Sequence, residues 1–221
     1  MQTIALVSQK GGAGKTTLAL HLAVAWQQAG RNTAVIDLDP QASAANWGDR
    51  REANLPVVRS AHASRLEQEL EDVRGAGGEI VVLDTAPHSD AVILGAAKVA
   101  DLVVIPCRPS ILDLEALAGT LELVSITPVP VLAVLNAVLP HISDNDRAEE
   151  AINKMGAAVC PVRISRRVAF SRALLRGVTA QEYEPNGKAA GEITGLFQQV
   201  SEQVGEGQQQ DEHKTSGGCN G

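Results

Sequence analysis

Cysteine is scarce in this chain, and its distribution excludes two common ways of stabilising a small protein. Cys107, Cys160 and Cys219 are odd in number, lie far apart and show no Cys-x-x-Cys spacing, so neither a disulfide framework nor a zinc site is expected. Aromatic residues make up only 2% of the sequence, which argues against a base-stacking platform for single-stranded nucleic acid. No apolar run approaches the ~20 residues of a membrane span, and the N-terminus lacks a secretory pattern. We therefore expect a cytoplasmic protein.

Charge and length set two further limits. A formal net charge of −7 excludes indiscriminate attraction of the whole surface to nucleic acid, so any DNA site has to be a local patch. The 221 residues suit one compact domain with a substantial core. Short apolar runs alternate with helical patterns along the chain, which predicts right-handed βαβ units. The expected fold is α/β: a single doubly wound, mainly parallel sheet flanked by helices.

A glycine-rich segment between the first apolar run and the first helical pattern is the clearest functional signal. Gln9-Lys10-Gly11-Gly12-Ala13-Gly14-Lys15-Thr16-Thr17 has the small residues that let a backbone curl its N–H groups around nucleotide phosphates at a helix N-terminus. Lys15 is expected to reach the β- and γ-phosphates and Thr16 to bind Mg²⁺. The predicted nucleotide-binding residues of this loop are Gly11, Gly12, Ala13, Gly14, Lys15, Thr16 and Thr17.

The second lysine of this loop makes the segment more specific. Lys-Gly-Gly-x-Gly-Lys-Thr-Thr resembles the deviant Walker A box of the ParA/MinD family of ATPases, a branch of the P-loop NTPases. The resemblance extends from Gln2 to about Val204. It implies that ATP is hydrolysed slowly to ADP and phosphate and that two subunits sandwich ATP in a homodimer. It also implies that Lys10 reaches across to the partner's nucleotide, so that Lys10 and Lys15 are both catalytic.

Three aspartates follow predicted strands and are candidates for Mg²⁺ and water. Asp84 ends the apolar run from Ile80 and is expected to hold Mg²⁺, because ligands of doubly wound sheets bind beyond the carboxyl ends of the strands. Asp37-Leu38-Asp39-Pro40-Gln41 matches the family's switch I box. By resemblance, Asp37 supports the Mg²⁺ shell and Asp39 positions the attacking water. The alternative for this acidic pair is a helix N-cap.

The base of the nucleotide has candidate contacts near the ends of two later strands. Asn136 ends the apolar run from Val131 and matches the family residue that hydrogen-bonds adenine, although asparagine at a strand end also serves turns. Pro161 and Val162 resemble the family's second wall around adenine. Asp113 resembles a family position near the dimer interface, and its alternative is an acid favoured by the helix dipole.

A basic segment stands out in this acidic chain. Guanidinium groups satisfy DNA phosphates without reading sequence, and family members that bind DNA carry their basic patch in this region. The alternative is a solvated helix face whose arginines pair with Glu182, Glu184 or Glu192. The predicted contacts to non-specific duplex DNA are Arg163, Arg166, Arg167, Arg172 and Arg176.

The last residues are rich in Gln, Gly and other polar residues. We expect an ATPase domain over residues 1–204 and a disordered polar tail over residues 205–221. MinD-like proteins end in a basic amphipathic helix that lies on the membrane, and this tail has neither its apolar face nor its lysines. No membrane partner is therefore expected.

These features predict a ParA-type partition ATPase in the small form without an N-terminal helix-turn-helix. It would use ATP and Mg²⁺, bind nucleoid DNA, and be stimulated by a ParB-like centromere-binding or adaptor protein to move plasmid or chromosome cargo. One alternative is the same ATPase positioning a protein organelle or cluster. MinD-like membrane positioning and a metabolic ATPase on the same fold are further alternatives.

Overall fold

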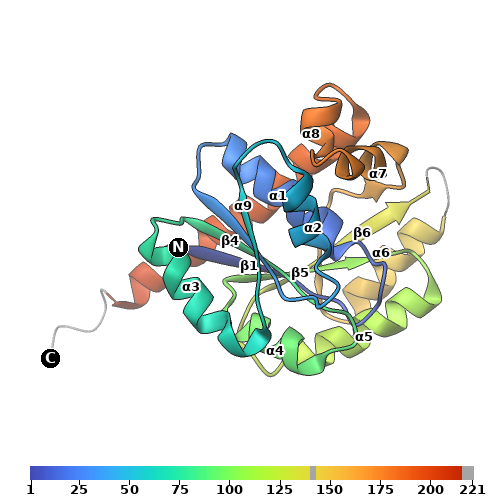
Figure 1. Cartoon of the computed structure of the whole chain (residues 1–221). Coiled ribbons are helices and arrows are strands. Elements are labelled where there is room, and N and C mark those ends of the chain that lie inside the picture. The colour runs from blue at the N-terminus through green and yellow to red at the C-terminus, as the bar shows by residue number, and fades with distance from the viewer. Residues whose placement is uncertain (140–142, 216–221) are drawn as a thin grey trace, which may run out of the picture.

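The structure is a computed structural model that describes residues 1–139 and 143–215 (Figure 1). The first elements are β1 (Gln2–Leu6), α1 (Lys15–Gln28), β2 (Thr33–Asp37), α2 (Ser43–Arg50), β3 (Val57–Ser60), the 3₁₀ turn η1 (Ala63–Arg65), α3 (Leu66–Gly75), β4 (Ile80–Asp84) and α4 (Asp90–Val99). They are followed by β5 (Leu102–Cys107), α5 (Ile111–Val124), β6 (Val131–Val138), α6 (Asp144–Lys154), β7 (Ala158–Val159), β8 (Ile164–Ser165), α7 (Val168–Leu175), α8 (Ala180–Tyr183) and α9 (Lys188–Thr215).

One parallel sheet organises the described part of the chain. Its strand order is β3-β2-β4-β1-β5-β6-β7. The short β8 also pairs with β6, at residues nearer the carboxyl end of β6 than those that pair with β7. The central strands β2, β4 and β5 are buried along their whole length, as expected for a parallel sheet that is covered on both faces. The predicted α/β fold with a doubly wound parallel sheet is confirmed.

The two faces of the sheet bury separate apolar clusters. Because side chains of a strand alternate between faces, Ile4 and Leu6 enter one cluster while Ala5 enters the other. Residues of α1, α2, α7, α8 and α9 complete the first cluster, and residues of α3, α4, α5 and α6 complete the second. Figure 1 shows these two helical layers on either side of the sheet.

The place of a ligand crevice follows from this winding. Strands β1 and β4 are neighbours, but α1 after β1 packs in the first cluster and α4 after β4 packs in the second. When the helices that follow two adjacent parallel strands pack on opposite faces of the sheet, a crevice opens at the carboxyl ends of those strands. The glycine-rich loop between β1 and α1 lies at this crevice.

The C-terminal helix differs from the sequence prediction in extent. Helix α9 packs through Ile193, Leu196, Val200 and Val204, but its backbone continues to Thr215, beyond the domain end placed at residue 204. Residues 216–221 of the predicted tail lie outside the described residues. The division at 204/205 stays a prediction.

Candidate nucleotide site

The glycine-rich loop adopts a backbone that depends on two of its glycines. Gly12 and Gly14 have φ values of 72° and 106°, a region that is costly for residues with a Cβ. Gly14 is also the N-cap of α1, and a Cβ there would collide with the side-chain amide of Asn136. Helix α1 therefore presents its N-terminal N–H groups at the loop, which is the arrangement that binds phosphate.

Lys15 lies folded over the inside of this loop. Its Nζ donates to the carbonyl oxygens of Ser8 and Lys10 at 3.3 Å each, and its side chain is buried. Burial lowers the pKa of Lys15, while Asp84 and Asp39 raise it in opposition. The lysine is thus a desolvated cation held where the phosphates of a bound nucleotide would need one.

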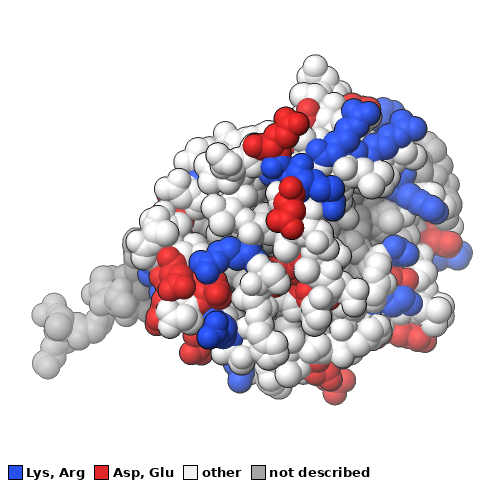
Figure 2. All heavy atoms as spheres, in the orientation of Figure 1, with Lys and Arg blue, Asp and Glu red and all other residues white. Residues whose placement is uncertain are grey.

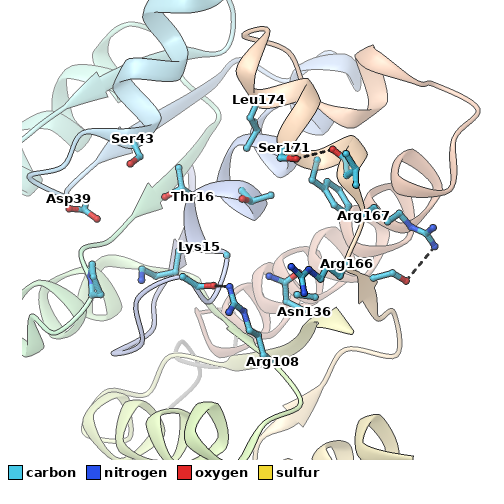
Figure 3. Close-up of a pocket in the computed structure, with 18 of the residues that line it drawn as sticks. Lys15, Thr16, Asp39, Ser43, Arg108, Asn136, Arg166, Arg167, Ser171 and Leu174 are labelled. Carbon is cyan, nitrogen blue, oxygen red and sulfur yellow. Dashed lines mark hydrogen bonds between the residues drawn. The ribbon is translucent and has the colours of Figure 1, made fainter. Parts of the chain in front are cut away.

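A cavity of about 750 Å³ opens beside the loop and is large enough for a nucleotide. Figure 3 shows the phosphate loop, Asp39 and the segment before α7 around it. Its lining residues are Gly12, Gly14, Lys15, Thr16, Thr17, Asp39, Gln41, Ser43, Pro87, Arg108, Asn136, Ala137, Ser165, Arg166, Arg167, Val168, Phe170, Ser171 and Leu174.

Asp84 has the environment of a metal ligand. Its carboxylate is fully buried, and neither oxygen accepts a hydrogen bond within the described residues. Burial raises the pKa of Asp84 to about 7, against the smaller lowering effects of the Thr16 hydroxyl and the Lys15 cation. An unpaired buried carboxylate next to a threonine hydroxyl fits the oxygen ligand set that Mg²⁺ prefers. Thr16 and Asp84 are the residues that would hold it.

Asp37 accepts backbone hydrogen bonds in the structure, and its predicted support of the Mg²⁺ shell stays a prediction. Its Oδ2 accepts the N–H groups of Ala44 and Ala45 at 2.8 and 3.0 Å, and its Oδ1 accepts the N–H of Asp39 at 3.0 Å. The buried carboxylate therefore satisfies the free N–H groups at the start of α2. Asp37 thus stabilises the start of α2, although the N-cap residue itself is Ala42.

Asp39 differs from Asp37 because it faces the cavity. It is half-buried, its Oδ1 accepts the Gln41 N–H at 2.9 Å, and its side chain lies across the cavity from Thr16 and Lys15 (Figure 3). A carboxylate in this place can accept a proton or hydrogen bond from a water beside the phosphates.

Lys10 lies outside the main cavity. Together with Gln9, His88, Asp90 and Ala116 it lines a neighbouring hollow of about 400 Å³. Lys10 is not among the residues that line the nucleotide cavity of its own subunit. The predicted reach of Lys10 to a partner's nucleotide stays a prediction.

The residues predicted to contact adenine lie in different surroundings in the structure. Asn136 lines the cavity, and its Nδ2 donates to the Ala13 carbonyl at 2.6 Å, so it also fastens the phosphate loop. Pro161 and Val162 do not line the cavity: Pro161 is exposed, and Val162 packs against Gly195 of α9. Their predicted contact with adenine stays a prediction. The short β8 pairs with β6, and residues between Ser165 and Leu174 line part of the cavity.

Arg108 is a cavity residue that the sequence analysis missed. It follows β5, is exposed, and its Nη2 donates to the carbonyl oxygen of Gly12 in the phosphate loop. The available signal was a cation directly after a wholly apolar strand. Asp113 lies in the first turn of α5 and accepts a hydrogen bond from the N-cap residue Ser110, and its place near a dimer interface stays a prediction.

The arginines of the basic segment fall into two groups. Arg163 pairs with Asp146 and Glu149 on α6, and Arg167 pairs with Glu192 on α9. These two side chains are therefore partly neutralised, and the DNA contacts predicted for all five arginines stay a prediction. Arg166, Arg172 and Arg176 are exposed, and Arg176 lies over the Tyr183 ring at 5.0 Å. Figure 2 shows Lys and Arg side chains gathered where Figure 1 places α7 and α8.

His21 connects the phosphate-loop helix to the wall formed by α7. It is fully buried, its Nε2 accepts the Ala180 N–H at 3.0 Å, and its Nδ1 lies 2.6 Å from the Thr17 carbonyl. Since Nε2 accepts from a backbone N–H, the proton of the neutral ring is assigned to Nδ1. The ring packs edge-on against Phe170, which lines the cavity.

We expect this histidine to make the protein sensitive to acid. Burial lowers the pKa of His21 from 6.5 to about 4. As the pH falls from 6.5 to about 4, His21 is protonated in the unfolded chain but stays neutral in the folded chain. The free energy of unfolding therefore declines by up to about 3 kcal/mol. His21→Asn should flatten this decline in urea titrations between pH 7 and 4, whereas replacing the exposed His62 should not. An unchanged slope in His21→Asn contradicts the assignment.

Together these residues define a P-loop nucleotide-binding protein. The model of the CobQ/CobB/MinD/ParA nucleotide-binding domain matches residues 4–180. The chain therefore belongs to this family, which includes the ParA and MinD ATPases, and the resemblance found in the phosphate loop is confirmed.

Curated relatives match nearly the whole chain. The carboxysome distribution protein A of Gloeobacter kilaueensis is 33% identical over 210 residues, covering 92% of this chain and 94% of the relative. Its namesake from Halothiobacillus neapolitanus is 29% identical, covering 90% and 95%. The chromosome-partitioning ATPase Soj of Thermus thermophilus is 26% identical, covering 93% and 98%.

Solved structures support the fold. Apo McdA from Cyanothece superposes with a TM-score of 0.71 at 18% identity, covering 92% of this chain and 99% of that one. MinD of Pyrococcus horikoshii, solved with Mg-ADP, gives a TM-score of 0.73 at 18% identity, covering 93% and 98%. No helix within residues 1–139 and 143–215 combines the length and apolar character needed to cross a membrane.

Proposed function

We propose that this protein is a positioning ATPase. It binds ATP with Mg²⁺, forms a homodimer around the nucleotide, attaches to nucleoid DNA, and is released when an adaptor protein stimulates hydrolysis. The observation that carries this proposal is the placement of α7, which carries the exposed Arg172, on the wall of the nucleotide cavity. Nucleotide and DNA would then be bound by adjoining parts of one structural unit.

The chemistry assigned to the site is electrostatic. Mg²⁺, when bound at Thr16 and Asp84, would offset charge on the phosphate oxygens. Lys15 lies where it can stabilise negative charge developing on the transferred phosphoryl group, and Lys10 would add a second cation from the partner subunit. Asp39 orients the attacking water. With the partner lysine needed for a complete site, basal turnover of the isolated protein should be slow.

Dimerisation has support on the surface around the loop. Ile111 and Leu112, at the start of α5, are 74% and 61% exposed, three residues after the arginine that contacts the loop. Large apolar side chains next to a ligand site favour a protein contact. Lys10 lines a neighbouring hollow together with Ala116 of α5, the helix that begins with Ile111 and Leu112.

The cargo that we propose is a large protein assembly rather than a plasmid or chromosome. Two carboxysome distribution proteins are 29% and 33% identical to this chain over nearly its full length, which favours the alternative that the sequence analysis placed second. Plasmid or chromosome partition remains the second candidate, favoured by the similarity to Soj. The corresponding partner is an adaptor on the assembly in the first case and a ParB-like centromere-binding protein in the second.

The test of the proposal is binding to non-specific duplex DNA with ATP, ADP or no nucleotide, at low and moderate salt. We expect tight binding only with ATP and Mg²⁺, and an affinity that falls steeply with salt, because phosphate contacts release counterions. Equal binding in all three states, or none in any, contradicts the proposal.

The arginine assignments predict a graded response in the same assay. Arg172→Ala should lower DNA affinity about three- to tenfold for all sequences and reduce the salt slope by about 1, because an exposed guanidinium contacts a phosphate. Arg163→Ala should have a smaller effect, since that arginine is paired with Asp146 and Glu149. Arg147→Ala on α6, which removes the same charge from a 78% exposed side chain, is the control. Equal losses in all three variants would show that only net charge matters.

A further inference from the structure

Helix α2 begins at the cavity wall. The segment that precedes it carries Asp39 and Gln41, and its first residue, Ser43, also lines the cavity. Asp37 fixes the helix start through the N–H groups of Ala44 and Ala45, and fixes Asp39 through its N–H. A displacement of the Asp39–Gln41 segment on nucleotide binding would therefore be transmitted to a short, rigid helix.

The other end of α2 holds the turn between α7 and α8. Trp47 is almost fully buried, and its indole N–H donates to the Val178 carbonyl at 3.3 Å. Gly177 has a φ of 69°, and a Cβ on it would lie 2.5 Å from the carbonyl oxygen of Arg50. The turn and the end of α2 thus approach each other so closely that only glycine fits at position 177.

Arg51 is the polar centre of this contact. Its guanidinium makes a two-pronged ion pair with Glu182, at 3.0 and 2.6 Å, and donates to the Gly177 carbonyl at 3.1 Å. The arginine side chain is only 6% exposed, and its guanidinium carbon lies 4.9 Å from the Trp47 ring centre. A fork of this kind fixes geometry better than a single point contact does.

Glu182 extends the connection into the arginine-bearing part of the chain. It also caps α8 by accepting from the N–H and hydroxyl of Thr179. Arg176 ends α7 one residue before Gly177 and rests on Tyr183 of α8. Arg51 therefore helps to fix the position of this hairpin, and with it Arg172 and Arg176, beside the contacts of Trp47 and His21.

We propose that Arg51 is a positioning residue that couples the nucleotide to the DNA surface. The Asp39–Gln41 segment shifts with the bound nucleotide, α2 transmits that shift as a rigid rod, and the contact of Arg51 with Gly177 and Glu182 moves the α7–α8 hairpin. The DNA part of this inference rests on the proposed function. The mechanical part, from cavity to hairpin, does not. Coupling of this kind requires an element that two sites can bias, and α2 contacts both.

The experiment uses Trp47 as an internal reporter in a Trp26→Phe background, which leaves Trp47 as the single tryptophan. We expect ATP–Mg²⁺ and ADP–Mg²⁺ to give different Trp47 emission. In Arg51→Gln this difference should disappear while ATP affinity stays within about twofold, and the preference of DNA for the ATP state should fall about tenfold, a typical size for coupling between sites. Arg51→Lys, which keeps the charge but not the fork, should lie between the two.

Arg31→Gln is the matched control, because it removes the same charge as Arg51→Gln. Arg31 makes an exposed ion pair with Glu79, away from α2. Thermal unfolding of each variant separates local from global effects. If no nucleotide state of the parent protein binds DNA, the proposed function fails. The coupling is then still supported if the emission difference between ATP and ADP is lost in Arg51→Gln and kept in Arg31→Gln. The coupling is overturned if Trp47 does not distinguish ATP from ADP, if Arg51→Gln keeps the difference, or if Arg51→Gln no longer binds ATP.

Discussion

Lys15→Ala is expected to lower the affinity for ATP by about 100-fold or more, the size associated with removing one partner of a buried charge pair. The structure gives two reasons. Lys15 is the buried cation of the loop, and its ammonium group joins the Ser8 and Lys10 carbonyls across it. The variant therefore loses both the charge that meets the phosphates and a tie that shapes their binding site. Titration calorimetry with ATP and Mg²⁺ measures the loss.

A second lysine variant separates this effect from a general loss of charge. Lys98 lies in the last turn of α4, is exposed, and belongs to the opposite face of the sheet, so Lys98→Ala should bind ATP normally. Thermal unfolding without nucleotide should be similar for both proteins, because the burial of Lys15 is unfavourable to its charge. ATP affinity within threefold of the parent in Lys15→Ala contradicts the placement of the phosphates in this loop.

Much of the fold could be predicted from local sequence. Runs such as Ile80–Asp84 are wholly apolar up to a terminal acid, and a strand that is buried on both faces needs that pattern. The phosphate loop was equally accessible, because its function requires small residues at fixed spacing beside a lysine and threonines. Both signals are contained in a few consecutive residues.

What the sequence could not predict depends on partners far along the chain or on the exact path of a turn. Asp37 and Asp39 look alike in the sequence, but Asp37 meets the N–H groups of Ala44 and Ala45 while Asp39 faces the cavity. The ion pair between Arg51 and Glu182 joins residues that lie 131 positions apart. Short strands such as β8 redirect the chain within two residues, and the cavity is lined by residues from Ser165 onward rather than by Pro161.

The arginine segment was only partly predictable for the same reason, because its ion pairs involve acids from distant parts of the chain. A cluster of arginines indicates excess positive charge, but the availability of each guanidinium depends on which acids the fold brings beside it. Glu192 reaches Arg167 from α9, and Asp146 and Glu149 reach Arg163 from α6. Tertiary packing, rather than local composition, therefore determines which of these arginines form ion pairs and which stay exposed.

Asp39→Ala should separate ATP binding from hydrolysis. The carboxylate makes only a local contact, to the Gln41 N–H, so its loss should leave ATP affinity within a few-fold of the parent. Hydrolysis should fall about 100-fold or more, because the water beside the phosphates loses the group that orients it. Single-turnover phosphate release measures the chemical step, and the ATP-bound protein should stay on DNA for longer. Normal turnover in this variant contradicts the role of Asp39.

Two further aspartates make this prediction specific. Asp49→Ala removes an exposed carboxylate from α2 and should leave turnover unchanged. Asp37→Ala should instead lower the free energy of unfolding by about 2 kcal/mol or more, because it strands buried N–H groups at the start of α2. If Asp39→Ala lost stability as Asp37→Ala does, its effect on turnover would come from the position of α2. If only turnover changes in Asp39→Ala, the two carboxylates of the Asp-x-Asp pair have separate roles: Asp37 positions helix α2 and Asp39 positions the water.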